Sequence, residues 1–207
     1  MTSFTYSTLE TAIKDFVEDD GDELDAAIDN IMDLAQCRVA RDLDLEIFRT
    51  VANGTIALSA RFLSLPSDCI MVNSLWISVS GTKTRLGRRT VEYCEDYAPD
   101  ASVEDQPAFF SEYDTSQVLL APVSDASYSY TLYYLKRPSP LSASNTTTWI
   151  STHAGDLLFY ACLIETENFL MESSPELVQQ WKNGYIERLA VAKPELSKIA
   201  RKEHRVA

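Results

Sequence analysis

Glycine is scarce in this sequence, with six residues among 207, and they do not cluster. Phosphate-binding loops need closely spaced glycines, because only glycine lets the backbone approach a phosphate closely. Neither G-x-x-x-x-G-K-[S/T] nor G-x-G-x-x-G occurs, and the G-x-S-x-G elbow of many hydrolases is missing too. The common nucleotide-binding loops and that hydrolase signature are therefore excluded.

Cysteine and histidine are also few. The four cysteines lie at least 25 residues apart, so no C-x-x-C pair exists to hold zinc: Cys37, Cys69, Cys94 and Cys162. A chain of this size folds without a disulfide framework, so we expect free thiols, as in a reducing cytoplasm. The two histidines are His153 and His204, and only His153 has candidate partners nearby.

Three groups of residues could suggest chemistry, and each has a simpler explanation. Ser151, His153 and Asp156 could be drawn as a triad, but a helix start with a capping serine explains the same spacing. The run from Asp19 to Glu23 lacks the twelve-residue ligand spacing of a calcium hand, so we interpret it as an acidic turn. With 31 acidic residues, chance carboxylate pairs leave a glycosidase site open. We expect no catalytic residue, no metal site and no cofactor.

Long apolar runs and excess positive charge are absent as well. No stretch reaches the roughly 18 apolar residues of a membrane span, and the N-terminus lacks a secretory-signal pattern. The net charge of −13 disfavours tight binding to a nucleic-acid backbone. The hydrophobic fraction of 45% is enough for one globular domain, or for one domain with an insertion.

Helical periodicity marks both ends of the chain. Residues 7–17 begin with a capping-box pattern, Ser7 to Glu10, followed by an apolar stripe, and a second helix is expected from about 23 to 43. Further helices are expected from about 154 to 171 and from Pro175 onward, with Pro194 ending or bending the last one.

The middle of the chain is rich in β-branched and aromatic residues. Asn53-Gly54 predicts a hairpin turn, and residues 70–79 form a strand with apolar groups on both faces. A short helix is expected at 90–97, and Tyr128, Tyr130, Leu132 and Tyr134 fall on one face of a strand. These signals predict an antiparallel meander of five or six strands.

Together the patterns predict an α+β fold, in which about four helices from both chain ends form a bundle and an antiparallel sheet is inserted between them. The expected organisation is an N-terminal helix pair at 1–45, the β-region at 46–149, a C-terminal helix pair at 150–192 and a basic arm at 193–207.

The arm carries five cations against two carboxylates, which leaves the rest of the chain about sixteen charges negative. A basic, weakly structured arm on an acidic body suits docking to an acidic protein, although a frayed helix end has the same composition. The candidate docking residues are Lys193, Lys198, Arg201, Lys202 and Arg205. A second candidate surface is a stacking platform of Tyr128, Tyr130, Tyr133 and Tyr134, but only Lys136 and Arg137 lie close in sequence, so we favour core packing.

Several short phrases follow one another along the chain: Phe62-Leu63-Ser64-Leu65-Pro66-Ser67-Asp68, Pro107-Ala108-Phe109-Phe110, Gln117-Val118-Leu119-Leu120-Ala121-Pro122, the run from Tyr128 to Pro138, Pro140-Leu141, Thr148-Trp149-Ile150, Asp156-Leu157-Leu158-Phe159-Tyr160-Ala161, and Trp181 with Tyr185. In this order and spacing they resemble the head-to-tail adaptor (connector) proteins of tailed bacteriophages over about residues 8–190. One departure is Ser111-Glu112-Tyr113, where family members often carry a glycine.

The resemblance implies a structural role in the virion neck, for a protein made in the host cytoplasm. Such subunits form a homo-oligomeric ring, typically of twelve copies, between the portal and the tail or nozzle proteins. The bundle would form the ring wall and the basic arm would reach the portal. DNA would pass through the channel without specific binding, and a negative lumen would help it slide.

Three alternatives stay open: a stopper or other tail-completion protein, a small carbohydrate- or peptide-binding module that uses the tyrosines, and an enzyme with an unrecognised carboxylate site. Assembly symmetry separates them, because the adaptor implies twelvefold symmetry and many stoppers are sixfold.

Overall fold

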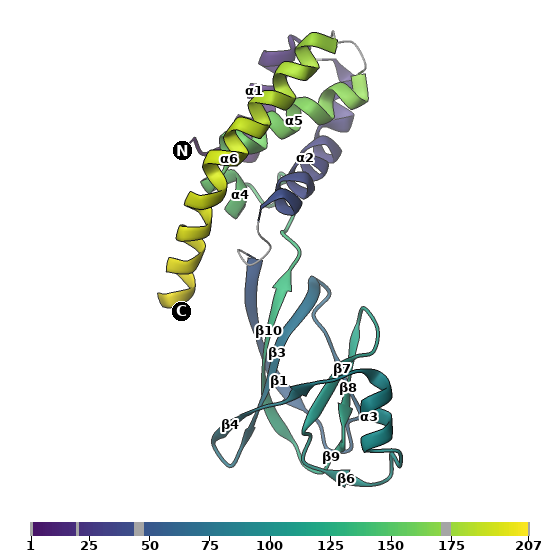
Figure 1. The fold of residues 1–207 in the computed structure, drawn as a ribbon. Coiled ribbons are helices and arrows are strands. Elements are labelled where there is room, and N and C mark those ends of the chain that lie inside the picture. The colour runs from purple at the N-terminus through teal and green to yellow at the C-terminus, as the bar shows by residue number, and fades with distance from the viewer. Residues whose placement is uncertain (1, 20, 44–47, 171–174, 207) are drawn as a thin grey trace. The chain divides into compact units, whose positions relative to one another are not determined.

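The computed structural model describes residues 2–19, 21–43, 48–170 and 175–206, with side chains for all of these except 170, 197 and 199–206. The fold is α+β (Figure 1). The chain divides into two compact units, a helical unit of residues 1–47 and 138–207, and a sheet unit of residues 48–137.

The helical unit is organised around one buried helix. Its elements are α1 (Tyr6–Val17), α2 (Asp22–Asp42), α4 (Trp149–His153), α5 (Gly155–Leu170) and α6 (Pro175–Val206). Helix α5 contacts each of the other four, and its Leu157, Leu158 and Ala161 are fully buried. Within the described residues the helical unit holds five helices where a bundle of about four was predicted, because the segment that leads into α5 forms the short helix α4, and α3 of the sheet unit makes six. The predicted end of α5 at Met171 lies outside the described residues.

The cap of α1 differs from the predicted one. Thr5 has the extended backbone of an N-cap, and the Thr8 backbone N–H donates to its hydroxyl oxygen at 3.3 Å. The Thr8 side chain in return accepts from the Thr5 backbone N–H at 2.8 Å, which completes a capping box. The predicted box of Ser7 and Glu10 is wrong, because the helix begins two residues earlier and Glu10 pairs with Lys14 at 2.8 Å instead.

Helix α6 continues through Pro194, where the sequence predicted an end or a bend. A proline inside a helix removes one backbone hydrogen bond, and packing can offset that loss. Here Leu196, two residues further on, is fully buried. Earlier in the helix Gly184 lets α6 approach α5 closely, since a Cβ there would lie 2.6 Å from the Tyr160 ring. The Arg188 guanidinium lies 3.9 Å from the centre of the same ring.

The sheet unit contains three sheets where one antiparallel meander was predicted (Figure 1). The first, with strand order β1-β10-β3-β4, joins β1 (Arg49–Ile56), β10 (Tyr128–Lys136), β3 (Cys69–Val79) and β4 (Thr82–Arg85). The second, of order β2-β8-β7-β5, joins β2 (Phe62–Ser64), β8 (Gln117–Ala121), β7 (Phe109–Glu112) and β5 (Gly87–Arg88). The third pairs β6 (Glu104–Asp105) with β9 (Val123–Ser124), and the β5–β7 and β6–β9 pairs are parallel.

These elements form three layers. One face of the first sheet, including Leu75 and Leu132, packs with Val118 and Leu120 of β8 in the main core. The intervening residue of β8, Leu119, points to the other side and packs with Cys94 of helix α3 (Val91–Tyr97), which confirms the short helix expected at 90–97. The second sheet is therefore covered on both sides, by the first sheet and by α3. The free face of the first sheet and helix α3 are the two opposite outer layers of this unit.

Asn53 and Gly54 do not form the predicted hairpin turn. Both lie inside β1, where Asn53 pairs with Thr131 and Gly54 pairs with Tyr130 of β10. A Cβ at residue 54 would lie 2.8 Å from the Tyr130 ring, so glycine lets this ring pack closely against β1. The glycine accommodates an aromatic ring from a distant strand, and this function has no local sequence signature.

A bulge in β3 explains why this strand has apolar residues on both predicted faces. Tyr133 of β10 pairs with Ser74, whereas the next residue, Tyr134, pairs with Val72, so Asn73 is the extra residue. The shift turns both Val72 and Leu75 toward the core, although three positions separate them. It also gives Asn73 an unusual position at the edge of the outer face.

Alkaline pH is expected to destabilise the sheet unit through Tyr134. Its hydroxyl donates to Asp68 Oδ1 at 3.1 Å, and burial together with this hydrogen bond raises the pKa of Tyr134 to about 12. Because the unfolded chain loses this proton near pH 10 and the folded chain keeps it, the contribution is intact below pH 10 and is lost as the pH rises toward 12. Urea denaturation should show that the free energy of unfolding at pH 11 is lower than below pH 10 by on the order of 1 kcal/mol. Tyr134→Phe should reduce this loss, and an equal loss in the variant would contradict the assignment.

Candidate docking surfaces

The basic residues near the C-terminus belong to a continuous helix and not to a weakly structured arm. Lys193 and Lys198 lie on α6 and are exposed. The side chains of the other three predicted docking residues, Arg201, Lys202 and Arg205, lie outside the described residues. A helix C-terminus favours cations, because the last carbonyl groups carry partial negative charge. The cations in this segment therefore suit the helix as well as a partner.

Ser151 is held in a cap and is not placed as a nucleophile. Its hydroxyl donates to the Thr148 carbonyl oxygen at 3.1 Å and accepts from the Thr148 backbone N–H at 2.9 Å. Ser151 is fully buried, so a substrate has no access to it. His153 stacks on Trp149 with ring centres 4.8 Å apart, and Asp156 lies in the first turn of α5. This geometry matches the start of a helix and gives no support to a hydrolytic triad.

The acidic turn between α1 and α2 is closed by local interactions. Glu18 ends α1 in the left-handed conformation, and the Gly21 backbone N–H donates to Asp19 Oδ1 at 2.8 Å. Asp20 lies outside the described residues. Across the described part of the chain, no cluster of three or more His, Cys, Asp or Glu residues could hold a metal ion. No helix in that part is both long and apolar enough to cross a membrane.

The four tyrosines proposed as a stacking platform do not share one face. Tyr128, Tyr130 and Tyr134 pack on the main core, as the favoured interpretation predicted. Tyr133 faces the opposite way and lines a groove on the outer face of the first sheet. Three of the four are therefore unavailable as one platform, and only Tyr133 belongs to the outer surface.

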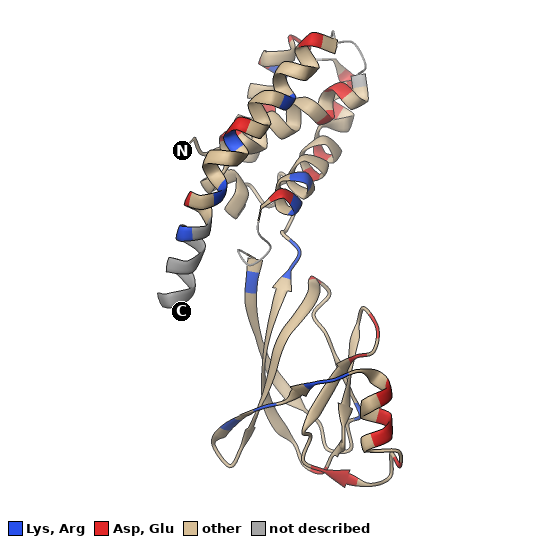
Figure 2. Ribbon diagram, viewed as in Figure 1, with Lys and Arg blue, Asp and Glu red and all other residues tan. Residues whose placement is uncertain are grey.

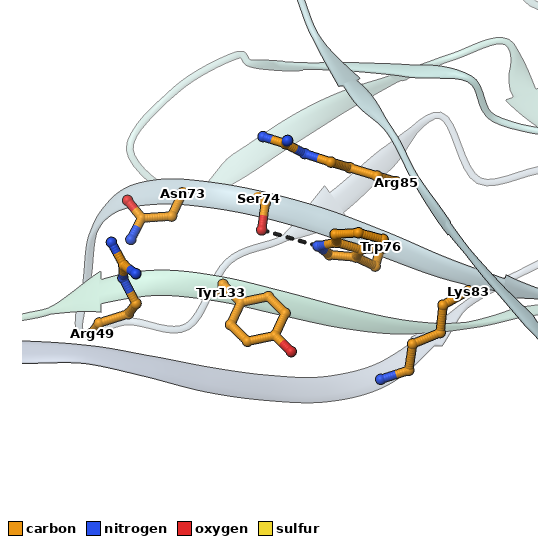
Figure 3. A pocket seen from close by; sticks show the side chains of 7 residues that line it. All are labelled: Arg49, Asn73, Ser74, Trp76, Lys83, Arg85 and Tyr133. Carbon is orange, nitrogen blue, oxygen red and sulfur yellow. Dashed lines mark hydrogen bonds between the residues drawn. The ribbon is translucent and has the colours of Figure 1, made fainter. Parts of the chain in front are cut away.

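This groove, hereafter the basic groove, has a volume of about 460 Å³. Figure 3 shows the seven side chains that line it, which come from all four strands: Arg49, Asn73, Ser74, Trp76, Lys83, Arg85 and Tyr133. Cross-strand pairing places Tyr133 beside Ser74 and Trp76 beside Arg85. The Trp76 Nε1–H donates to Ser74 Oγ at 3.1 Å, which fixes the indole along the groove floor.

Positive charge is concentrated here, although the chain is strongly acidic. Lys83 and Arg85 are exposed, and neither has an ion-pair partner within the described part of the chain. The bulge residue also places a donor in the interior: the Asn73 side-chain nitrogen is buried and has no hydrogen-bond acceptor among the described residues. Such a donor is costly unless an acceptor reaches it. The cations and the aromatic rings together favour an acidic ligand.

Sequence reasoning did not find this groove. Its residues are spread from Arg49 to Tyr133, and only the strand order β1-β10-β3-β4 brings them together. One local signal was available, since the segment from Lys83 to Arg89 holds four cations in a chain of net charge −13.

Comparison with known proteins gives a match that covers nearly the whole chain. A search of curated proteins found no match. A family profile described as SU10 adaptor protein matches residues 4–205, which include both units and the basic end of α6. This match confirms the resemblance to phage adaptors that the sequence phrases indicated. The chain therefore belongs to the SU10 adaptor protein family, a family of phage head-to-tail adaptors.

Proposed function

We propose that twelve copies of this protein form a ring between the portal and the tail in the virion neck. The observation that carries the proposal is the family match over residues 4–205. A ring of identical subunits needs a heterologous contact whose rotation closes, and a ring sharing the portal axis gives DNA a continuous channel. The proposed role is mechanical and needs no catalytic residue.

The end of α6 is the proposed portal-docking element. Exposed cations such as Lys198 favour an acidic surface on the portal, because opposite charges steer association and disfavour wrong partners. Residues 198, 201, 202 and 205 follow the spacing of one helix face. The opposite end of the ring would receive the tail or nozzle proteins.

DNA is proposed to pass through the ring without specific binding. The net charge of −13 gives most surfaces of the protein a potential that repels phosphate. A channel wall of this sign would let DNA slide during ejection.

Co-expression with the portal protein of the same genome tests the proposal. The expected result is a stacked ring under the portal in negative-stain images. A chain that stays folded, ignores the portal and binds a tail protein would favour a stopper or tail-completion role instead.

A further inference from the structure

The basic groove needs an acidic occupant. It is lined by three cations, Arg49, Lys83 and Arg85, and by the aromatic rings of Trp76 and Tyr133. Carboxylate oxygens accept hydrogen bonds from the guanidinium and ammonium groups of such side chains. An acidic surface with aromatic side chains would match both features of the groove.

Such a surface exists on the other outer layer of the same unit. Helix α3 and the segment after it carry most of the acidic residues on that side of the sheet unit, drawn in red in Figure 2. Five of these carboxylates are exposed: Glu92, Asp96, Asp100, Glu104 and Asp105. Two large aromatic side chains are exposed among them, Tyr93 at 43% and Tyr97 at 51%. We call this surface the acidic face.

One nearby carboxylate is already neutralised, since Glu95 forms an ion pair with Arg61. The Arg89 guanidinium lies over the Tyr93 ring, 5.4 Å from its centre, which places one cation beside this face. Glu92 and Asp96 remain, four residues apart on α3 and both exposed. Within the described residues neither of these two has an ion-pair partner.

The two surfaces cannot meet within one copy. The main core, the second sheet and the smaller core under α3 separate the outer face of the first sheet from the acidic face. Figure 1 shows β4 and α3 on opposite sides of the sheet unit. Complementary surfaces on opposite sides of one body join identical copies head to tail, which is the contact type that builds rings.

We infer that the basic groove of one copy receives the acidic face of the next copy. Glu92 and Asp96 pair with Lys83 and Arg85 of the neighbour, and Tyr93 and Tyr97 pack near Trp76 and Tyr133. This inference rests on the proposed ring and names the contact that closes it.

Single-stranded nucleic acid is the rival occupant, since cations beside aromatic rings also suit stacked bases. The copy-to-copy contact is favoured because it uses both surfaces, whereas nucleic acid would leave the acidic face without a function. The strongly acidic chain would also repel a longer phosphate backbone beyond the groove.

Charge exchange on the full-length chain tests the inference. One variant reverses the groove, Lys83→Glu with Arg85→Glu, and a second reverses the face, Glu92→Lys with Asp96→Lys. Each alone should weaken self-association by more than about tenfold, because like charges then face each other. An equimolar mixture should restore assembly, since each variant offers the surface that the other lacks. A control reverses two exposed cations of the helical unit, Arg41→Glu with Lys182→Glu, and should assemble normally.

Sedimentation velocity and mass photometry, with and without the portal protein, provide the measurement. Failure of the mixture to restore assembly, or a wild-type chain that stays monomeric in both conditions, would overturn the inference. Loss of single-stranded DNA binding in the groove variant, with its assembly unchanged, would overturn it in favour of nucleic acid. The proposed function fails separately: rings that obey the charge exchange but ignore the portal would support this contact and refute the portal role. Portal-bound rings that assemble normally in every charge-reversal variant would support the portal role and refute this contact.

Discussion

Reversing the cations near the end of α6 is expected to weaken portal binding by about 100-fold. The variant carries Lys198→Glu, Arg201→Glu, Lys202→Glu and Arg205→Glu. It changes four positive charges into four negative ones, so that an acidic portal surface would repel the helix end. It leaves Leu196 in place, because that side chain is buried and its loss would disturb the helix itself.

Surface plasmon resonance on immobilised portal rings gives the affinity, and circular dichroism verifies that the variant is folded. Lys182→Glu, at an exposed position on the same helix, is the matched control and should bind normally. Wild-type affinity should also fall as salt is raised, more steeply than that of the four-residue variant. Equal affinity for the variant and the wild type would remove α6 from the portal contact.

Replacing Phe110 by alanine is expected to cost about 3–5 kcal/mol in the free energy of unfolding of the sheet unit. Phe110 is 1% exposed and belongs to the core between the two larger sheets. Truncation removes the ring contacts and leaves a cavity that close-packed neighbours fill only in part. Since whole domains are stable by about 5–15 kcal/mol, this one change would unfold a large fraction of the molecules at elevated temperature.

Trp76 lies in the sheet unit and the other two tryptophans lie in the helical unit, so Trp149→Phe with Trp181→Phe leaves a fluorescent probe in the sheet unit alone. Urea denaturation in that background measures the effect. Phe62→Ala is the matched control, because Phe62 is 41% exposed on strand β2 of the same sheet and its truncation should cost about 1 kcal/mol or less. A loss for Phe110→Ala no larger than for Phe62→Ala would contradict the described core.

Local patterns predicted the elements that depend on local forces. The stripe in α2, including Leu24, Ile28 and Ile31, follows from helical spacing, and these residues are buried as expected. The short helix α3 was also predicted, where Thr90 caps its start by accepting from the Tyr93 backbone N–H. In both cases the information lies within about one helical turn of the residue concerned.

Features created by distant strands could not be predicted in the same way. Gly54 resembled a turn residue, but it accommodates the ring of Tyr130, which is 76 residues further along the chain. The bulge at Asn73 depends on its register with β10, and the basic groove depends on the order of four strands. The prediction that Pro194 ends or bends the last helix was also wrong. Local propensity favours an end there, but α6 continues, and Leu196 just beyond the proline is fully buried.

The rotational symmetry of the assembled ring tests the central claim most directly. Electron cryo-microscopy of the co-purified complex with the portal, averaged without imposed symmetry, would count the copies. The account predicts twelve copies in one ring stacked on the portal, with neighbouring sheet units in contact. A sixfold ring, or monomers scattered on the portal, would contradict it.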